Sequence, residues 1–310
     1  MRPADRKVVL VTRRSRLEDL LVRFNTRDQA KFYVEHLGAD FGDYAAEHET
    51  YQAARKTVVQ ALEAHGRFQV IDRSFLPNFI FGADDVVLAL GQDGVVANTL
   101  KYLDGQPLAG INPDPQRWDG VLLPWEPGAV RAALPKLLSG QAHLQEVTMG
   151  EARFADGQCL HAVNDFFIGP KSHTSARYEI RLNEQKEIQS SSGIIVSTGL
   201  GSTGWMRSVV TGSCAVAADA AHRPVAWKFR GRSWADRELR FAVREPFPSR
   251  SSQASLVCGS VAASETLVVT SLMAENGVIF SDGVEADFLA FNAGTMVQVR
   301  VASKVGRLVQ

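Results

Sequence analysis

Apolar runs and amphipathic stretches alternate through the first part of the chain. Short runs of apolar, often β-branched residues are typical of buried strands, and they cover residues 7–12, 67–72, 85–90 and 108–112. The stretches between them predict helices over residues 16–24, 27–36, 43–65, 95–103 and 127–139. Because strands and helices alternate, we expect a parallel, Rossmann-like sheet wrapped by helices in an α/β domain of residues 1–141.

The pattern changes after about residue 142, where short strands separated by Gly, Asn and Asp dominate. These strands are predicted over residues 146–154, 161–168, 177–182, 193–198, 238–243, 255–257, 267–271, 277–281 and 296–301. A short helix is expected from Trp205 to about Thr211, before Gly212, and residues 244–252 read as a loop with two prolines and three serines. A β-rich second domain of residues 142–310 follows from this pattern, with its last strands as candidates to return to the first domain.

Composition narrows the class of protein. The 310 residues carry 34 Lys plus Arg and 34 Asp plus Glu, so the net charge is zero and the basic excess of a nucleic-acid binder is missing. The three cysteines, Cys159, Cys214 and Cys258, show no metal-binding spacing and are expected to be reduced thiols. Apolar runs stay well short of the roughly 20 residues that cross a bilayer. We therefore expect a cytoplasmic protein with no membrane or nucleic-acid partner.

One glycine-containing turn directly follows an apolar strand. Residues 85–90 (DVVLAL) run into Gly91, Gln92, Asp93 and Gly94, and a helical stretch follows. Free backbone N–H groups and the helix dipole favour a phosphate at such a helix start, and the glycines permit close approach. Asp93 would stand there as a carboxylate able to accept a proton from a hydroxyl or to help hold Mg²⁺ near phosphates. The alternative is a plain turn, since Asp-Gly is a common turn pair.

A second glycine pattern lies in the β-rich half. Residues 199–204 (GLGSTG) match the dinucleotide fingerprint GxGxxG after an apolar strand, and Asp219 lies 20 residues after Gly199. A hydride-transferring enzyme is therefore one open interpretation. The other is a hydroxyl-rich turn in which Ser202, Thr203 and their neighbours donate hydrogen bonds to a nucleotide.

Four segments, in the same order, resemble NAD kinases. Residues 91–94 (GQDG) are similar to the family's GGDG turn, and residues 164–165 (ND) to its Asn-Glu pair. Residues 197–205 (STGLGSTGW) resemble its Ser/Thr-rich loop, and residues 281–284 (SDGV) its late S-x-D-G-Q turn. Residues 110–120 (GINPDPQRWDG) are most similar to the mitochondrial-type branch of the family.

The resemblance implies an NAD kinase-like fold and transfer of the terminal phosphate of ATP to the 2′-hydroxyl of the adenosine ribose of NAD, giving NADP. By position, Asp93 is the implied catalytic base, and Mg²⁺ is expected to bridge the ATP phosphates without a dedicated protein ligand. The resemblance further implies a homodimer. It assigns nucleotide binding to Gly91, Gln92, Gly94, Asn112, Asn164, Asp165, Thr198, Gly201, Ser202, Thr203 and Trp205.

Departures from the family pattern leave alternatives open. Gln92 stands where the family has its second glycine, Val95 replaces a usual Thr, and Asp165 is one methylene shorter than Glu. A nucleotide-binding protein that has lost turnover is one alternative. A kinase for a lipid or sugar hydroxyl is another, because diacylglycerol and sphingosine kinases resemble this family in the glycine turn. Either ATP or polyphosphate could be the phosphoryl donor.

Overall fold

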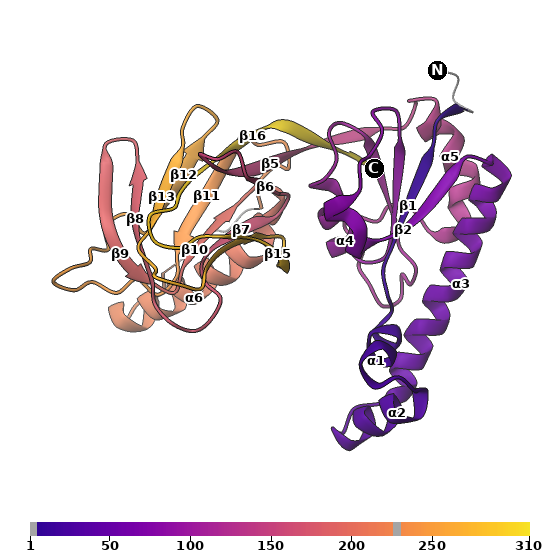
Figure 1. Ribbon diagram of the computed structural model, residues 1–310, viewed down its shortest axis with the longest axis horizontal. Coiled ribbons are helices and arrows are strands. Elements are labelled where there is room, and N and C mark those ends of the chain that lie inside the picture. The colour runs from indigo at the N-terminus through magenta and orange to yellow at the C-terminus, as the bar shows by residue number, and fades with distance from the viewer. Residues whose placement is uncertain (1–4, 226–230) are drawn as a thin grey trace. The chain divides into compact units, whose positions relative to one another are not determined.

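The computed structural model describes residues 5–225 and 231–310 (Figure 1). The chain divides into two compact units. Unit 1 contains Met1–Gln145 together with Arg307–Gln310, and unit 2 contains Glu146–Gly306. The sequence placed the border between residues 141 and 142, so the division found here lies four residues later, and the chain's last four residues belong to unit 1.

Unit 1 is built on a parallel sheet. Strands β1 (Val8–Thr12), β2 (Phe68–Asp72), β3 (Val86–Leu90) and β4 (Pro107–Ile111) lie in the order β2-β1-β3-β4, and the end of β16 (Met296–Val309) pairs in parallel with β4. Every residue of β1 and β3 is buried. Such uniformly apolar strands are expected when helices cover both faces of a sheet.

The helices of unit 1 begin and end at local signals. Ser15 caps α1 through a capping box with Glu18, Thr26 caps α2, and Gly66 ends α3 with a φ of 96°. Helices α3 and α5 contribute to the main core of the unit, and α1 and α2 pack in a smaller cluster with the N-terminal part of α3 (Figure 1). The elements are α1 (Arg16–Phe24), α2 (Arg27–His36), α3 (Phe41–His65), η2 (Arg73–Asn78), α4 (Asp93–Leu100), η3 (Pro127–Ala129) and α5 (Val130–Leu138).

Unit 2 is a sandwich of two antiparallel sheets. One contains β16-β13-β8-β9, with β5 paired to β16 and β6 paired to β5, and the other has the order β12-β11-β10-β7-β14-β15. Alternate residues of β7 face opposite ways: Phe166 and Ile168 join the core between the sheets, while Phe167 packs toward Met206 of α6. The elements are β5 (Leu144–Phe154), β6 (Cys159–Ala162), β7 (Asp165–Pro170), β8 (Ala176–Leu182), β9 (Gln185–Ser191), β10 (Ile194–Ser197), η4 (Leu200–Thr203), α6 (Trp205–Ala221), β11 (Glu238–Val243), β12 (Cys258–Ala262), β13 (Leu267–Ser271), β14 (Gly277–Ser281) and β15 (Val284–Ala290).

The predicted fold class, an α/β unit followed by a β-rich unit, is confirmed, but several elements differ. Residues 161–168 are not one strand, because β6 ends at Ala162 and β7 begins at Asp165. Helix α6 does not stop at Gly212 but continues to Ala221, and residues 255–257 precede a strand rather than form one. Strands β9 and β15 were not predicted. Within the described residues, no helix is both long and apolar enough to span a membrane.

Candidate functional site

The glycine turn of unit 1 lies where β3 gives way to α4. Gly91 has a φ of 158°, and a Cβ there would lie 2.8 Å from Cγ2 of Val95, so packing requires the glycine. Gly94 is different, because a Cβ at this position would meet nothing within 4 Å. Packing therefore does not require a glycine at position 94. Because Gly94 has no side chain, the start of α4 stays open to a ligand such as a phosphate. Gln92 is the N-cap residue and makes no side-chain capping bond.

Asp93 is the first residue of α4 and is partly exposed. Its Oδ1 accepts a hydrogen bond of 2.9 Å from the backbone N–H of Leu122. This bond fixes the carboxylate through one oxygen and leaves the other to accept a proton. The carboxylate therefore has a defined orientation at the end of a parallel strand, where ligands of α/β sheets commonly bind.

Asn112 organises the loop that supplies this N–H. Its Nδ2 donates to the carbonyl of Trp118 over 3.0 Å, and its Oδ1 accepts from the N–H of Asp114 over 3.0 Å. Gly120, with a φ of 65°, leaves room for the amide, since a Cβ there would lie 2.6 Å from Nδ2. The side chain predicted to contact nucleotide therefore has both of its polar atoms bonded within residues 112–123.

In unit 2, a buried turn holds the Asn-Asp pair. The carboxylate of Asp282 accepts hydrogen bonds from the backbone N–H groups of Val163, Asn164 and Asp165, the shortest being 2.6 Å to Asn164. Because these N–H groups bind Asp282 between the end of β6 and the start of β7, the two segments do not form one continuous strand. Asn164 itself is only half-buried, so its side chain can reach solvent or a ligand.

Asp165 has an unusual environment for a carboxyl group. The residue is 7% exposed, and burial followed by the nearby charge of Asp282 raises its pKa to about 7. The carboxyl therefore exchanges its proton near neutral pH. Such a group can donate a hydrogen bond in one state and accept one in the other.

The hydroxyl-rich loop after β10 is held mostly by its own hydroxyls. Oγ1 of Thr198 donates to the carbonyl of Val163 over 2.5 Å and accepts from the N–H of Gly201 over 3.1 Å. A Cβ on Gly201 would overlap the carbonyl of Asn164. Oγ of Ser202 accepts from the N–H of Arg232, while Thr203 is exposed. Thr198 and Ser202 thus shape the loop, and Thr203 is the hydroxyl that faces solvent.

Trp205 lines a pocket of about 640 Å³ in unit 2. Its ring stacks on that of Phe167, with centroids 5.8 Å apart and an interplanar angle of 11°, and the guanidinium of Arg244 lies 5.6 Å from the ring centroid. Lys171 adds a second cation to the lining. Aromatic faces beside cations suit a planar ring that carries an anionic group. The sequence offered no signal for Phe167 or Arg244, because one lies within a buried strand and the other follows a distant one.

Thr198 and Ser202 also line a second pocket of about 570 Å³ in unit 2. Its other side is formed by β11 and β12, where the ion pair of Arg232 with Glu238 measures 2.7 Å. The two pockets together place Trp205 and the hydroxyl-rich loop beside solvent-accessible space.

The topology rules out the hydride-transfer interpretation of residues 199–204. β10 runs antiparallel to both of its neighbours, β7 and β11, and the glycines form a 3₁₀ turn. A dinucleotide fingerprint requires a parallel β-α-β unit. Asp219 lies within α6, so it does not end a second parallel strand.

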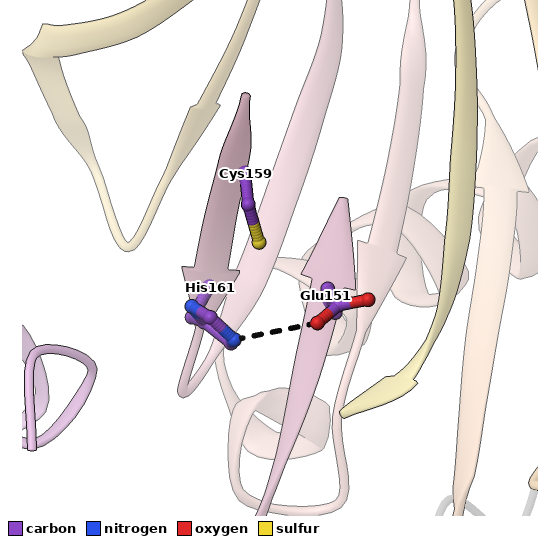
Figure 2. A group of neighbouring side chains, drawn as sticks. All are labelled: Glu151, Cys159 and His161. Carbon is purple, nitrogen blue, oxygen red and sulfur yellow. Dashed lines mark ion pairs between the residues drawn. The ribbon is translucent and has the colours of Figure 1, made fainter. Parts of the chain in front are cut away.

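Glu151, Cys159 and His161 form a cluster of metal-ligand types on the β5–β6 hairpin, with ligand atoms within 4.8 Å of one another (Figure 2). Glu151 and His161 are 3.7 Å apart, but Arg153 and Arg300 also bind this carboxylate, at 3.0 and 2.7 Å. Hydrogen bonding from Arg153, together with Arg300, lowers the pKa of Glu151 to about 2. A cation would have to displace two guanidinium groups, so the cluster is better described as an ion-pair network.

Comparisons with known proteins agree on the fold. No protein-family model matches the chain, and no curated protein matches its sequence. A yeast NADH kinase solved in complex with NADH is similar in structure, with a TM-score of 0.58 and 13% identity over 98% of this chain and 83% of that one. An NAD kinase from Archaeoglobus fulgidus in complex with ATP gives a TM-score of 0.53 and 15% identity, over 98% of this chain and 93% of that one. At these identities the likeness shows that the chain has the NAD kinase fold.

Proposed function

We propose that this protein transfers the terminal phosphoryl group of ATP to the 2′-hydroxyl of the adenosine ribose of NAD, which makes NADP. The observation that carries the proposal is the partly exposed carboxylate of Asp93, oriented by the N–H of Leu122 at the open start of α4. The ligands of the two structural neighbours, NADH in one and ATP in the other, support this choice of substrates.

In the proposed reaction, Asp93 accepts the proton of the 2′-hydroxyl as the ribose oxygen forms a bond to the terminal phosphorus. The bond from that phosphorus to the bridging oxygen breaks, and ADP leaves. Little covalent chemistry falls to the protein, because positioning and charge do most of the catalysis in phosphoryl transfer. Gly94 carries no side chain that would cover the start of α4, so phosphate oxygens could approach it there. The N–H of Gly91 already donates to the carbonyl of Ile111, so Gly91 would act by packing against Val95.

Mg²⁺ prefers oxygen ligands. It would fit this turn, because the carboxylate of Asp93 offers one oxygen and the phosphates of a bound nucleotide offer others. When bound with ATP, the ion would offset the negative charge of the phosphates. The side chain of Gln92 stands at the N-cap, where the related turn has glycine. It adds bulk at the turn but removes no N–H group.

Unit 2 supplies the proposed contacts to the dinucleotide. The side-chain amide of Asn164, the carboxyl of Asp165 and the exposed hydroxyl of Thr203 would hydrogen-bond the nucleosides. Trp205 would offer an aromatic face. Asn112, Thr198, Gly201 and Ser202 would act by shaping their loops, since their polar atoms or close packing are committed within the protein.

A coupled assay for NADP formation tests the proposal. Wild-type protein is expected to make NADP from NAD, ATP and Mg²⁺, and parallel reactions with polyphosphate and with NADH define the donor and acceptor. Asp93→Asn keeps an oxygen for the N–H of Leu122 but cannot act as a base, so kcat should fall by about 10²- to 10⁴-fold with dinucleotide binding retained. Folded wild-type protein that makes no NADP with any donor would refute the proposal.

Calorimetry separates the alternatives. Dinucleotide binding without turnover would identify a binding protein, and recovery of activity in Gln92→Gly combined with Val95→Thr would locate the cause at the turn. Turnover of a lipid or sugar hydroxyl instead of NAD would identify a kinase of another class. Light scattering tests the expected homodimer, and fractionation of cells tests the expected cytoplasmic location.

A further inference from the structure

Asp93 is oriented by a loop, and that loop is itself anchored to a helix far away in the sequence. Residues 112–123 connect the end of β4 to the N–H of Leu122 that binds Asp93. At the middle of this loop, Arg117 donates from Nη2 to Oδ1 of Asp43 on α3 over 2.6 Å. Asp43 and Arg117 are 74 residues apart in the chain.

We infer that the Arg117–Asp43 ion pair is a positioning device for the carboxylate of Asp93, and that Arg117 acts on the reaction through the loop without touching substrate. The inference about rate rests on the proposed function.

Hydrogen bonds tie the first part of the loop, residues 112–118, to the position of Arg117. Backbone N–H groups of Arg117 and Trp118 both donate to the carbonyl of Asp114, each over 3.1 Å, which makes a tight turn around Arg117. The side chain of Asn112 binds the same turn at Asp114 and Trp118. A movement of Arg117 would therefore shift the segment from Asn112 to Trp118, which leads along the chain into Leu122.

The last part of the loop is equally constrained. The N–H of Leu123 donates to the carbonyl of Gly120 over 3.0 Å, so the peptide that carries Leu122 lies within a turn. A Cβ on Gly110 of β4 would overlap the carbonyl of Leu122, so the loop lies directly on the strand. These contacts define the direction in which the N–H of Leu122 points toward Asp93.

Asp43 is a strong anchor because it binds two arginines. Arg16 occupies Oδ2 at 2.7 Å, while Arg117 occupies Oδ1. Hydrogen bonds from Arg117 and then from Arg16 lower the pKa of Asp43 to about 2, so the anchor stays charged over the pH range of any assay. Exposed ion pairs usually contribute little to stability. The expected effect of this one is therefore on position more than on folding.

Arg16 provides a matched control. It binds the same carboxylate with similar geometry, but its hydrogen-bond partners, Asp43 and Glu47, lie outside residues 112–123. Arg117→Ala is expected to lower kcat about tenfold or more with KM changed by less than about threefold, because misplacing a catalytic group slows chemistry more than binding. Arg16→Ala should stay within about twofold of wild type, and Arg117→Lys should recover part of the loss.

Two measurements test the inference. Amide hydrogen exchange at Leu122 should be faster in Arg117→Ala than in wild type and Arg16→Ala, and this readout needs no activity. In a double-mutant cycle, the kcat of the variant that combines Asp43→Ala with Arg117→Ala should be no lower than the kcat of Arg117→Ala alone. Unchanged exchange at Leu122 in Arg117→Ala would overturn the inference, since Asn112 alone would then hold the loop. Faster exchange in a protein whose wild type makes no NADP would instead reject only the proposed function.

Discussion

Replacing Asp165 by Asn should change how the stability of this protein depends on pH. The carboxyl is 7% exposed, and burial together with the charge of Asp282 raises its pKa from 3.8 to about 7. Asn has nearly the same shape but no charge at any pH. The substitution therefore removes a titration while leaving the volume of the site almost unchanged.

The size and sign of the expected change in stability follow from the protons that the folded and unfolded states bind. Between about pH 4 and pH 7, the folded state keeps a proton on Asp165 that the unfolded state has released, so folding becomes less favourable as pH rises. Three pKa units correspond to about 4 kcal/mol, at about 1.36 kcal/mol each. Asp165→Asn should therefore gain stability relative to wild type from pH 4 to pH 8, by up to about 4 kcal/mol.

Denaturant unfolding at several pH values measures this difference. Effects of the substitution that do not depend on pH cancel when the values at pH 4 and pH 8 are subtracted. Glu238→Gln is the control, because hydrogen bonds from Arg232 and then Ser260 lower the pKa of Glu238 from 4.5 to about 2, and both values lie below pH 5. The stability difference between Glu238→Gln and wild type should therefore stay constant from about pH 6 to pH 8.

Two outcomes would count against the reasoning. A stability difference between Asp165→Asn and wild type that stays flat from pH 4 to pH 8 would mean that the carboxyl is solvated or paired in the folded state. A difference that shrinks as pH rises would mean that its pKa is lowered. Either result would also contradict our assignment of a carboxyl that exchanges its proton near neutral pH to Asp165.

The remaining predictions concern glycines and an aromatic side chain. Gly201→Ala should lower the free energy of unfolding by about 2–4 kcal/mol, because its Cβ would overlap backbone at Asn164, and denaturant titration measures the loss. The added methyl group of Gly94→Ala would meet nothing within 4 Å, so the variant should keep or slightly raise the free energy of unfolding while raising KM for ATP in the coupled assay. An unchanged KM would show that the phosphates of ATP do not bind at the start of α4. Trp205→Ala should weaken dinucleotide binding about 10- to 100-fold by calorimetry, whereas Trp205→Phe should keep most of it.

Local signals determined much of the first unit. Helices α1 and α2 begin and end at the residues that the sequence predicts, because Ser15 and Thr26 satisfy the first free N–H groups from neighbouring positions. The buried strand β3 and the turn at Asp93 were likewise readable, since a continuous apolar run followed by glycine has few other structures available. The assignments of site residues to nucleotide binding and catalysis stay predictions.

Only the tertiary structure decided the features of the fold and site that depend on residues far apart in the sequence. The break between β6 and β7 exists because Asp282, 118 residues after Asn164, collects three backbone N–H groups. Arg117 binds Asp43 across 74 residues, and Arg244, which follows β11, lies against Trp205 at the start of α6. Hydrophobic periodicity and capping act over a few residues, whereas the pKa of Asp165 and the direction of the Asp93 carboxylate come from burial and from single hydrogen bonds between remote segments. The sequence therefore determined which residue types stand at the turn, and only the folded chain decided which of their atoms remain available for chemistry.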